Sequence, residues 1–473
     1  MCSIFGQINF LDPLCDSKKF INVSDTLRHR GPDSRNYLSD EVNYQFAFNR
    51  LAIMDLNRTG NQPMYSQCKR YVCIFNGEIY NHQKIFEEIK DLFKWEGSSD
   101  TEVLINAWSL WGEKTLDKID GMFAFAVWDT KNKDVILARD RIGEKPLYYY
   151  TENGSLIFSS RPNPILEIYP KLKKDFDLEN LNYYFEAGYF LRKKSYIKNI
   201  FKLEPGNFIK FNKDGLLIKK YWSINDYNPK KVNSYTLDYH TDKCEDLLKE
   251  SISERIISDK PLGFLLSGGI DSSLVVSMAS KIMDKKNIKA FSLGFYNKQY
   301  DESIDASLVA KKLDINLDIK KITYKEVLKL LPDFYQKFDE PFAFLEFCQN
   351  TSLVWLTIAA FHHAREGELG RFVHPVWLFT QHLLCIHGRV VFALSYYKSI
   401  LFKIFVNNIP GCIPSILHST YTEPLSLSEG MKHEPVMLPK LETFNRLDKP
   451  WFGRKIFLQK IFETTFTDET DSC

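Results

Sequence analysis

Cys2 stands directly behind the initiator methionine in the opening stretch MCSIFG. Because residue 2 is small, removal of Met1 would leave a thiol and a free α-amine on the same residue. An α-amine with an ordinary pKa of about 7.7 to 8.0 can accept the thiol proton near neutral pH, and the resulting thiolate is a nucleophile. Cys2 is therefore a candidate N-terminal nucleophile, with an ordinary buried thiol as the alternative.

A second stretch that could do chemistry is LLSGGIDSSL, residues 265–274, which joins an apolar strand to a helix. Glycines permit a tight turn, serines add hydroxyl donors, and the start of a helix supplies partial positive charge. A phosphate cradle would be built from Ser267, Gly268, Gly269, Ser272 and Ser273. Asp271 would repel phosphate unless a cation intervened, which predicts Mg²⁺ between them. The alternative is a turn that only caps a helix.

Length and composition indicate a globular chain with more than one core. The 473 residues are 44% hydrophobic and 26% charged, and the formal net charge is +2. Neither disorder nor binding to nucleic acid or an anionic membrane through overall charge is expected.

The cysteines and the apolar stretches indicate the cellular compartment in which the protein is expected. Nine scattered cysteines without a C-x-x-C pair disfavour a disulfide framework or a structural zinc site. No basic-then-apolar leader opens the chain, and the most apolar stretch, from Val390, contains Lys398 and Lys403. We therefore expect a cytoplasmic protein without a membrane span.

The elements that must position these residues differ between the two halves. Up to about residue 221, short β-rich runs such as RYVCIFNGEIY, FAFAVWD and DVILARD predict stacked or sandwiched sheets. The polar stretch 223–235 is interpreted as a linker. Beyond it we expect a helix capped by Thr241, then alternating strands and helices that predict a parallel sheet. The apolar stripe of that helix would be Cys244, Leu247, Leu248, Ile252 and Ile256.

Several motifs occur in the order found in one known family. They are MCSIFG at 1, RHRGPDS at 28, RLAIMD at 50, NGEIYN at 76, SSDTE at 98, DGMFAFAVWD at 120, LARDRIGEKPLYY at 137, KLEPGNFIKF at 202, SGGIDSS at 267, FSLGF at 291 and FDEPFA at 338. On these motifs the sequence resembles the glutamine-hydrolysing asparagine synthetases, class II glutamine amidotransferases, from residue 2 to about 343. Ser3 replaces the family's usual glycine, and we expect this small residue to be tolerated.

The resemblance implies the domain organisation. An α+β glutaminase domain of the N-terminal-nucleophile type, with stacked antiparallel sheets between helices, would cover residues 2–215. A linker would span 216–240. The N-terminal part of an α/β ATP-pyrophosphatase domain with a parallel sheet would cover 241–343, followed by an atypical C-terminal region, 344–473.

The resemblance also implies the chemistry of the glutaminase half. The Cys2 thiolate would attack the carboxamide carbon of glutamine, and its α-amine would accept and return the proton. The Asn76 side chain and the Gly77 amide would stabilise the oxyanion. Taken alone, Asn76-Gly77 is also the strongest signal for a hairpin turn. His29 is interpreted as structural, because this mechanism needs no imidazole.

Glutamine would be held by its charged end. By the same resemblance, Arg50 would bind the α-carboxylate, since its planar fork suits bidentate pairing. Glu78 and Asp100 would accept hydrogen bonds from the α-ammonium, and the backbone of Ile53 would complete the pocket. Taken alone, Arg50 and Asp100 could form a surface ion pair.

For the second half the resemblance implies ATP and Mg²⁺. Aspartate would be activated as an acyl-adenylate with release of pyrophosphate, and ammonia set free at Cys2 would attack it. The residues assigned to ATP and pyrophosphate are Leu265, Ser267, Gly268, Gly269, Asp271, Ser272, Ser273 and Leu293, with Asp271 also on the metal. Further acidic candidates, or else solvated surface charges, are Asp301, Glu302, Asp339 and Glu340.

From about Phe344 the family motifs stop. The family's second Ser- and Gly-rich acidic string and the basic residues around aspartate have no counterpart here. No aspartate occurs between Asp339 and Asp448, and seven of the ten histidines follow residue 344. We interpret the change as a frameshift or a sequencing error. A metal site at His362 and His363 is the weaker alternative, because the pair lacks i, i+4 spacing.

The sequence thus predicts a glutamine-dependent asparagine synthetase, an ATP-dependent carbon–nitrogen ligase, whose second active site could be incomplete in this chain. Glutamine, aspartate and ATP are the expected partners, without nucleic acid or membrane, and a homodimer is an open option. One alternative is an amidotransferase acting on another carboxylate, such as a sugar acid or an antibiotic precursor. Another is a chain with glutaminase activity alone or only a ligand-binding role.

Overall fold

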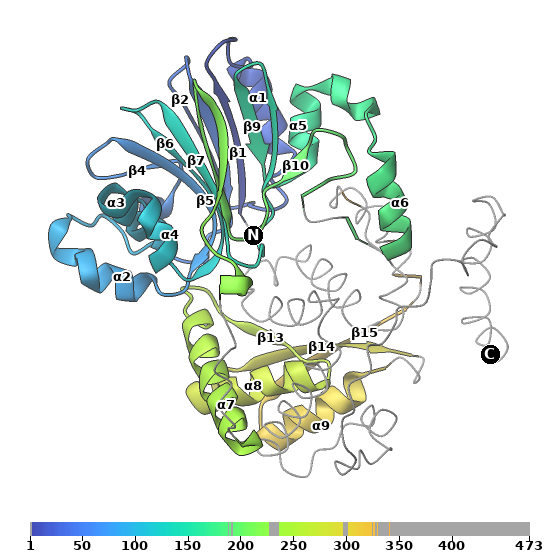
Figure 1. Cartoon of the computed structure of the whole chain (residues 1–473). Helices are drawn as coiled ribbons and strands as arrows, with labels where there is room; N and C mark the ends of the chain where they lie inside the picture. The colour runs from blue at the N-terminus through green and yellow to red at the C-terminus, as the bar shows by residue number, and fades with distance from the viewer. Residues whose placement is uncertain are drawn as a thin grey trace, which may run out of the picture. The chain divides into compact units, whose positions relative to one another are not determined.

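Two six-stranded sheets face each other in the first half of the chain (Figure 1). The computed structural model describes residues 2–187, 189–190, 193–226, 236–296 and 301–323, with residues 325, 326, 329 and 340. The first sheet has the order β10-β8-β9-β1-β3-β2 and the second β12-β11-β7-β6-β5-β4. Among the described residues the strand pairs of these two sheets run antiparallel, which confirms the predicted fold class.

The bounds of these strands follow the β-rich runs of the sequence. The first sheet contains β1 (Ser3–Asn9), β2 (Ser34–Ser39), β3 (Tyr44–Arg50), β8 (Tyr148–Glu152), β9 (Ser155–Ser159) and β10 (Phe201–Lys202). The second contains β4 (Met64–Tyr65), β5 (Tyr71–Ile79), β6 (Gly121–Asp129), β7 (Asp134–Arg139), β11 (Asn207–Asn212) and β12 (Gly215–Lys220). Strand β12 extends this sheet into the segment that the sequence analysis assigns to a linker.

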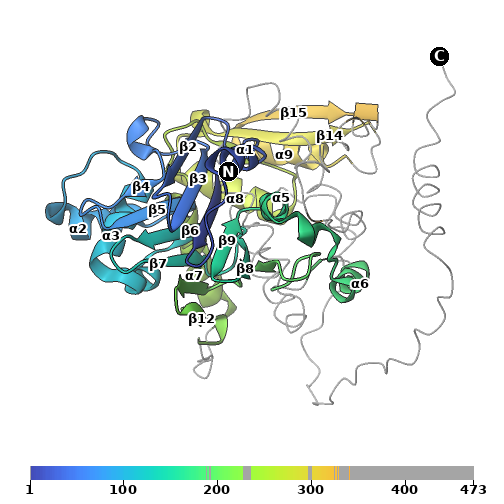
Figure 2. The same ribbon diagram turned by 90° about the horizontal axis from the view of Figure 1, so that it is seen from above.

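Helices cover the outer faces of both sheets (Figure 1, Figure 2). They are α1 (Ser17–Asp25), α2 (His82–Ile89), α3 (Asp100–Trp111), α4 (Thr115–Lys118) and α5 (Pro162–Ile168). A further helix, α6 (Leu178–Ala187), lies to one side of the sheets. Side chains of α1 and α5 pack on the first sheet, and those of α2 and α3 pack on the second. The first half of the chain therefore has four layers, with sheets inside and helices outside.

Successive side chains of each strand point to opposite faces of the sheet, and this alternation produces the layers. In β6, Ala124, Ala126 and Trp128 join the core between the sheets, whereas Phe123 and Phe125 face the helix layer. Neighbouring side chains in a strand point to opposite faces, so a strand buried on both sides is apolar throughout. Each large apolar side chain buried in this way contributes about 1.5 to 3 kcal/mol.

The second half contains the expected parallel sheet. Its order is β13-β14-β15, and both strand pairs are parallel. The elements are α7 (Leu237–Arg255), β13 (Gly263–Leu265), α8 (Ile270–Ile282), β14 (Lys289–Phe295), α9 (Ser303–Leu313) and β15 (Asn316–Ile322). One apolar cluster joins this sheet to all three helices.

Two sequence expectations for α7 are wrong. The helix is capped by Thr236, whose side chain accepts a hydrogen bond from the Tyr239 N–H, and Thr241 is buried inside the helix. Leu247 is 54% exposed, whereas Leu248 faces the core. Adjacent helical residues point about 100° apart, and in this helix the stripe that faces the core includes Leu248 and leaves Leu247 towards solvent.

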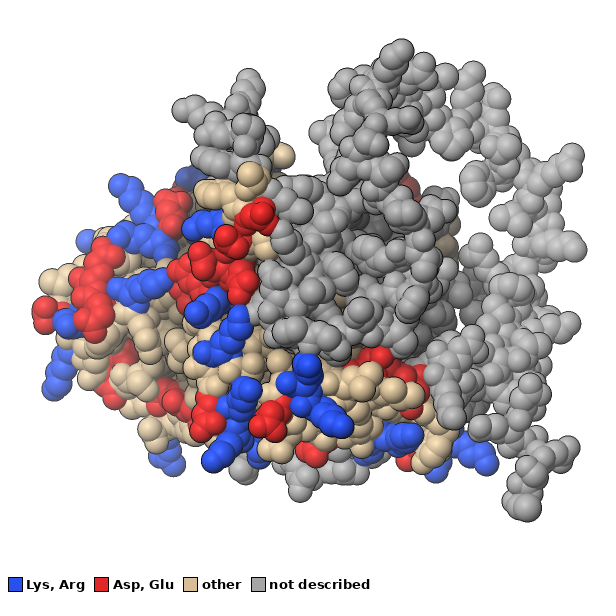
Figure 3. Space-filling model, turned by 90° about the horizontal axis from the view of Figure 1, so that it is seen from below, with Lys and Arg blue, Asp and Glu red and all other residues tan. Residues whose placement is uncertain are grey.

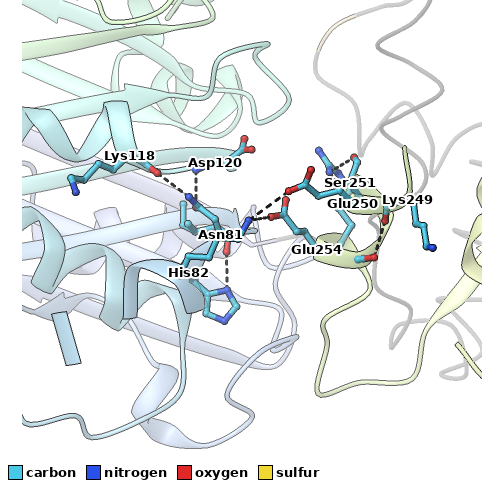
Figure 4. A network of polar contacts seen from close by, with 12 residues as sticks. Asn81, His82, Lys118, Asp120, Lys249, Glu250, Ser251 and Glu254 are labelled. Atoms are coloured by element: carbon cyan, nitrogen blue, oxygen red, sulfur yellow. Dashed lines mark hydrogen bonds and ion pairs between the residues drawn. The ribbon is translucent and has the colours of Figure 1, made fainter. Parts of the chain in front are cut away.

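Polar contacts join α7 and the segment after it to the first half of the chain. Lys84 Nζ lies 2.8 Å from Glu254 Oε1 and 3.8 Å from Glu250 Oε1. Nearby, Asn81 donates to the Lys118 carbonyl at 2.9 Å (Figure 4). The Asp55 N–H donates to the Asp259 carboxylate at 2.7 Å. This last contact holds the loop at residues 54–61 against the segment that follows α7.

The described surface carries mixed charge. Lysine and arginine side chains are interspersed with aspartate and glutamate on the face shown in Figure 3. Within the described ranges, no helix is long and apolar enough to cross a bilayer.

Candidate active site

Cys2 and Arg50 share the inner face of the first sheet. Ile4 in β1 and Phe48 in β3 point into the core between the sheets. Cys2 and Arg50 stand two positions from them and therefore point the same way. In the antiparallel register Ser3 pairs with Asn49, which makes Cys2 and Arg50 neighbours.

Asn76 and Glu78 share the inner face of the second sheet. They follow Ile74, an inter-sheet core residue, at spacings of two and four along β5. Asn76 and Gly77 lie inside this strand, paired with Ala124 and Phe123 of β6. The hairpin reading of Asn-Gly is therefore wrong.

One cavity of about 100 Å³ collects the residues predicted for the glutaminase site. Its lining includes Cys2, Arg50, Ile53, Asn76, Gly77, Glu78 and Asp100, and also Lys145. The sequence analysis did not single out Lys145, which lies in the LARDRIGEKPLYY motif.

The thiol of Cys2 is held by the backbone of one residue. Sγ accepts a hydrogen bond from the Leu51 N–H at 3.3 Å and lies 3.5 Å from the Leu51 carbonyl, to which the thiol can donate. Burial raises the pKa of this thiol, and the positive charges of the chain N-terminus, Lys145 and Arg50 oppose that rise. Arg30 Nε donates to the Cys2 carbonyl at 3.3 Å.

The Asn76 amide is buried without a partner. The residue is 1% exposed, and neither Nδ2 nor Oδ1 has a hydrogen bond among the described residues. A buried polar group left unsatisfied costs about 1 to 3 kcal/mol. Beside it, a Cβ on Gly77 would lie 2.1 Å from the Met122 carbonyl oxygen, so only glycine fits.

Arg50 organises the loop that forms one wall of the cavity. Its Nη1 donates to the Asn57 carbonyl at 2.7 Å and to Asn61 Oδ1 at 3.0 Å. Its Nη2 donates to the carbonyls of Met54 and Asp55. Arg50 is only 6% exposed, which rules out the surface ion pair. A bound carboxylate would therefore meet a guanidinium that already holds the loop.

The two acidic residues are buried as well. Burial raises the pKa of Glu78 to about 7, against the lowering effect of Lys145. Burial also raises the pKa of Asp100, although its Oδ2 accepts the Ile79 N–H at 3.0 Å. Both carboxyl groups thus bind protons more tightly than they would in water.

Ser3 and His29 lie beside the site. Ser3 is fully buried, and its hydroxyl accepts a hydrogen bond from the Asn49 side chain at 3.2 Å. His29 contacts the Thr26 carbonyl and the Arg161 guanidinium, and it is not part of the cavity lining. These contacts suit structural roles for both.

The loop between β13 and α8 has the geometry of a cradle. Gly268 has a φ of 81°, and a Cβ there would lie 2.5 Å from Asp305 Cβ. Ser267 and Ser272 hydroxyls lie 3.0 Å apart, and Gly269 is the N-cap of α8. Ser273 is fully buried, and its hydroxyl has no partner among the described residues.

Among the other residues predicted for the second site, three lie at this parallel sheet, whereas Glu340 contacts β10 of the first half. Leu265 ends β13, and Leu293 is buried in β14. Asp301 accepts a hydrogen bond from the Ser303 N–H at the start of α9. Glu340 pairs with Lys202 at 2.6 Å. Asp339 and everything from Phe344 onwards, including the frameshift hypothesis and His362, lie outside the described residues.

A cysteine at the head of the central strand of two facing antiparallel sheets defines the N-terminal-nucleophile class of amidotransferase. The family model described as "Glutamine amidotransferase domain" matches residues 1–222, and that described as "Asparagine synthase" matches 243–347. A putative asparagine synthetase [glutamine-hydrolyzing] 2 from Methanocaldococcus jannaschii is 31% identical over 363 residues, which are 72% of this chain and 69% of that relative. The chain belongs to the glutamine-hydrolysing asparagine synthetase family.

Other relatives extend well beyond the matched part. Asparagine synthetase [glutamine-hydrolyzing] 3 from Bacillus subtilis is 34% identical over 64% of this chain, and asparagine synthetase [glutamine-hydrolyzing] 1 is 33% identical over 72%. The matches cover 49% and 54% of these two proteins, so the chain spans about half their length. A solved glutamine phosphoribosylpyrophosphate amidotransferase from B. subtilis is 15% identical over 69% of this chain and 70% of its own, with a TM-score of 0.35, too low to support an inference.

The buried Glu78 links stability to pH. Its pKa of about 7 in the folded chain exceeds the ordinary 4.5, so between these values the folded chain keeps a proton that the unfolded chain releases. This stabilisation is full below about pH 4 and is lost as the pH rises through 7. We expect Glu78→Gln to have a free energy of unfolding about 1 to 3 kcal/mol above wild type at pH 8, with a smaller gain at pH 5.

Urea unfolding at both pH values measures this difference. Glu96→Gln is the matched control, because Glu96 is exposed on the same domain. An equal gain for Glu78→Gln at pH 5 and pH 8 would contradict the account of its burial.

Proposed function

We propose that this chain hydrolyses glutamine at Cys2 to glutamate and ammonia, as the first half of a glutamine-dependent asparagine synthetase reaction. One observation carries the proposal: the Asn76 amide is buried without a partner on the wall of the cavity that holds Cys2. An amide in this state can form hydrogen bonds with a ligand, a reaction intermediate or water that enters the cavity.

The proposed steps use groups on the cavity wall. The Cys2 thiolate attacks the glutamine carboxamide, and its α-amine accepts the thiol proton and gives a proton to the leaving ammonia. Asn76 Nδ2 and the Gly77 N–H donate to the oxyanion. Water then hydrolyses the γ-glutamyl thioester and releases glutamate.

Glutamine binding is assigned to the remaining residues of the cavity. Arg50 would hold the α-carboxylate, and its bonds to the loop at 54–61 would fix the wall against which glutamine rests. Glu78 and Asp100 would accept from the α-ammonium, and the backbone of Ile53 would complete the pocket.

For the second half we propose binding of ATP at the loop 267–273. The unpartnered Ser273 hydroxyl and the amides at the start of α8 suit phosphate oxygens. Among the described residues no three His, Cys, Asp or Glu side chains are grouped to hold a metal. Mg²⁺ would therefore be held by Asp271 together with phosphate oxygens, as is usual for this ion, and would neutralise phosphate charge.

The wider assignment extends to domains and partners. The proposal places the glutaminase domain at 2–215, the linker at 216–240 and the first part of the ATP-pyrophosphatase domain at 241–343. The two family matches, which end at 222 and 347, support this division. Aspartate would be the amide acceptor, and a reducing cytoplasm would keep Cys2 as a thiol. Assembly into a homodimer stays a prediction.

Glutamate release from glutamine tests the first half-reaction. We expect turnover by the wild-type chain and none by Cys2→Ala. Asn76→Ala should lower kcat about a hundredfold to a thousandfold, because it removes one oxyanion donor. Its free energy of unfolding should be unchanged or higher, since an unsatisfied buried amide is removed. Full activity of Cys2→Ala would refute the proposal, and full activity of Asn76→Ala would refute the oxyanion assignment.

Pyrophosphate release tests the second half-reaction. The family match ends at residue 347, and the sequence beyond it lacks the acidic and basic motifs expected around Mg²⁺ and aspartate. We expect no aspartate-dependent pyrophosphate release from ATP with ammonia supplied, so that this chain acts as a glutaminase alone. Robust release would contradict this and would require the missing ligands to lie within 344–473.

A further inference from the structure

A buried lysine lines the glutamine cavity without a part in the steps above. Lys145 is 2% exposed, and it borders the cavity together with Cys2 and Glu78. An ammonium group removed from water is unfavourable unless negative charge compensates it. A lysine at this position is therefore expected to serve a purpose that an apolar side chain would not.

The backbone that carries Lys145 is fixed by one carboxylate. Asp140 is fully buried and accepts hydrogen bonds from the N–H groups of Gly143 at 2.6 Å, Glu144 at 2.8 Å and Lys145 at 2.9 Å. Arg139 Nε donates to the Lys145 carbonyl at 2.7 Å. These bonds define the point from which the lysine side chain reaches the cavity.

Charged groups surround the ammonium of Lys145. Burial lowers the pKa of Lys145, and the negative charges of Glu78, Glu144 and Asp140 oppose this, while the positive charge of Arg30 adds to it. Burial is the largest of these effects and favours the neutral amine, whereas the three acidic neighbours favour the charged form. A positive charge at this place on the cavity wall would be compensated by these carboxylates.

That charge acts on two groups of the glutaminase site. After burial, Lys145 is the largest influence on Glu78, and it opposes protonation of the carboxylate, as the chain N-terminus also does, whereas Asp100 and Glu144 favour it. Lys145 also favours the thiolate of Cys2, in addition to the N-terminus and Arg50. Both groups need their deprotonated form: Glu78 to accept from an ammonium, Cys2 to attack.

We propose that Lys145 is a positioning residue for glutamine hydrolysis, which acts through Glu78 and Cys2 by keeping a positive charge on their shared cavity wall. The inference rests on the proposed glutaminase function. In this role Lys145 would neither touch the scissile amide nor transfer a proton. If its role were only to fill space, an apolar side chain of similar length would preserve the glutaminase activity at every pH.

The pH profile of kcat/KM for glutamine separates these roles. Lys145→Met keeps the side-chain length and removes the charge, so we expect the acid limb of the profile to move about one pH unit or more upward. KM at pH 7 should rise about tenfold, with recovery at higher pH. Lys145→Arg should keep the wild-type limb even if kcat falls. Lys131→Met, at an exposed lysine of the same domain, is the matched control and should match wild type.

An uncharged role would give a different result. If Lys145→Met lowers activity equally at every pH, or leaves the profile unchanged, the inference is overturned. A Glu78→Gln background adds a second check, because Lys145→Met should then change KM much less than it does in the wild type. Equal changes in both backgrounds would count against the route through Glu78.

A measurement without turnover distinguishes failure of this inference from failure of the proposed function. Alkylation of Cys2 by iodoacetamide, followed across pH by mass spectrometry of the N-terminal peptide, reports how readily the thiolate forms. We expect the midpoint to lie at higher pH in Lys145→Met than in wild type and Lys131→Met. If the chain does not hydrolyse glutamine but the alkylation midpoint of Lys145→Met is shifted, only the proposed glutaminase function is refuted. If the midpoint is not shifted, the proposed role of Lys145 is refuted.

Discussion

Cys2, Arg50, Glu78, Asp100 and Lys145 share one small cavity from which two packed sheets exclude most water. Burial raises the pKa of the thiol and of both carboxyl groups, and it lowers the pKa of the lysine. Loss of hydration favours the neutral form of every ionisable group, and only the neighbouring charges counteract it. The charge state of each group in the cavity therefore depends on the others, and binding of a zwitterion such as glutamine would change all of them together.

The cavity exists because the apolar alternation of the strands ends near one edge of the inter-sheet core. In β5, Val72 and Ile74 fill the core, and Asn76 and Glu78 continue the same face with polar side chains. The unpartnered Asn76 amide lowers stability unless a ligand completes it. An apolar residue at position 76 of β5 would pack better and raise the stability, but it would remove the hydrogen-bond donor that the proposed chemistry requires.

The strand pattern could be predicted because burial on both faces leaves a continuous apolar run, as in β6. The parallel sheet could be predicted from the alternation of β13, α8, β14 and α9. Roles for Arg50 and Asp100 came from family resemblance, since spacing alone fitted a surface pair equally well. The place of Lys145 could not be predicted, because it depends on contacts between segments far apart in the sequence. The bonds of Arg50 to residues 54–61 could not be predicted either, because they depend on the irregular backbone path of that loop. The prediction that Leu247 faces the core was wrong, because periodicity alone does not decide which of two adjacent leucines is buried.

Trapping the covalent intermediate tests the central claim most directly. The chain would be mixed with glutamine, quenched in acid during turnover and digested, and the N-terminal peptide would be weighed by mass spectrometry. The account predicts a γ-glutamyl group attached to the Cys2 sulfur of a peptide that lacks Met1. Glutamate release with Cys2 unmodified throughout, or from a chain that keeps Met1, would contradict the N-terminal-nucleophile mechanism.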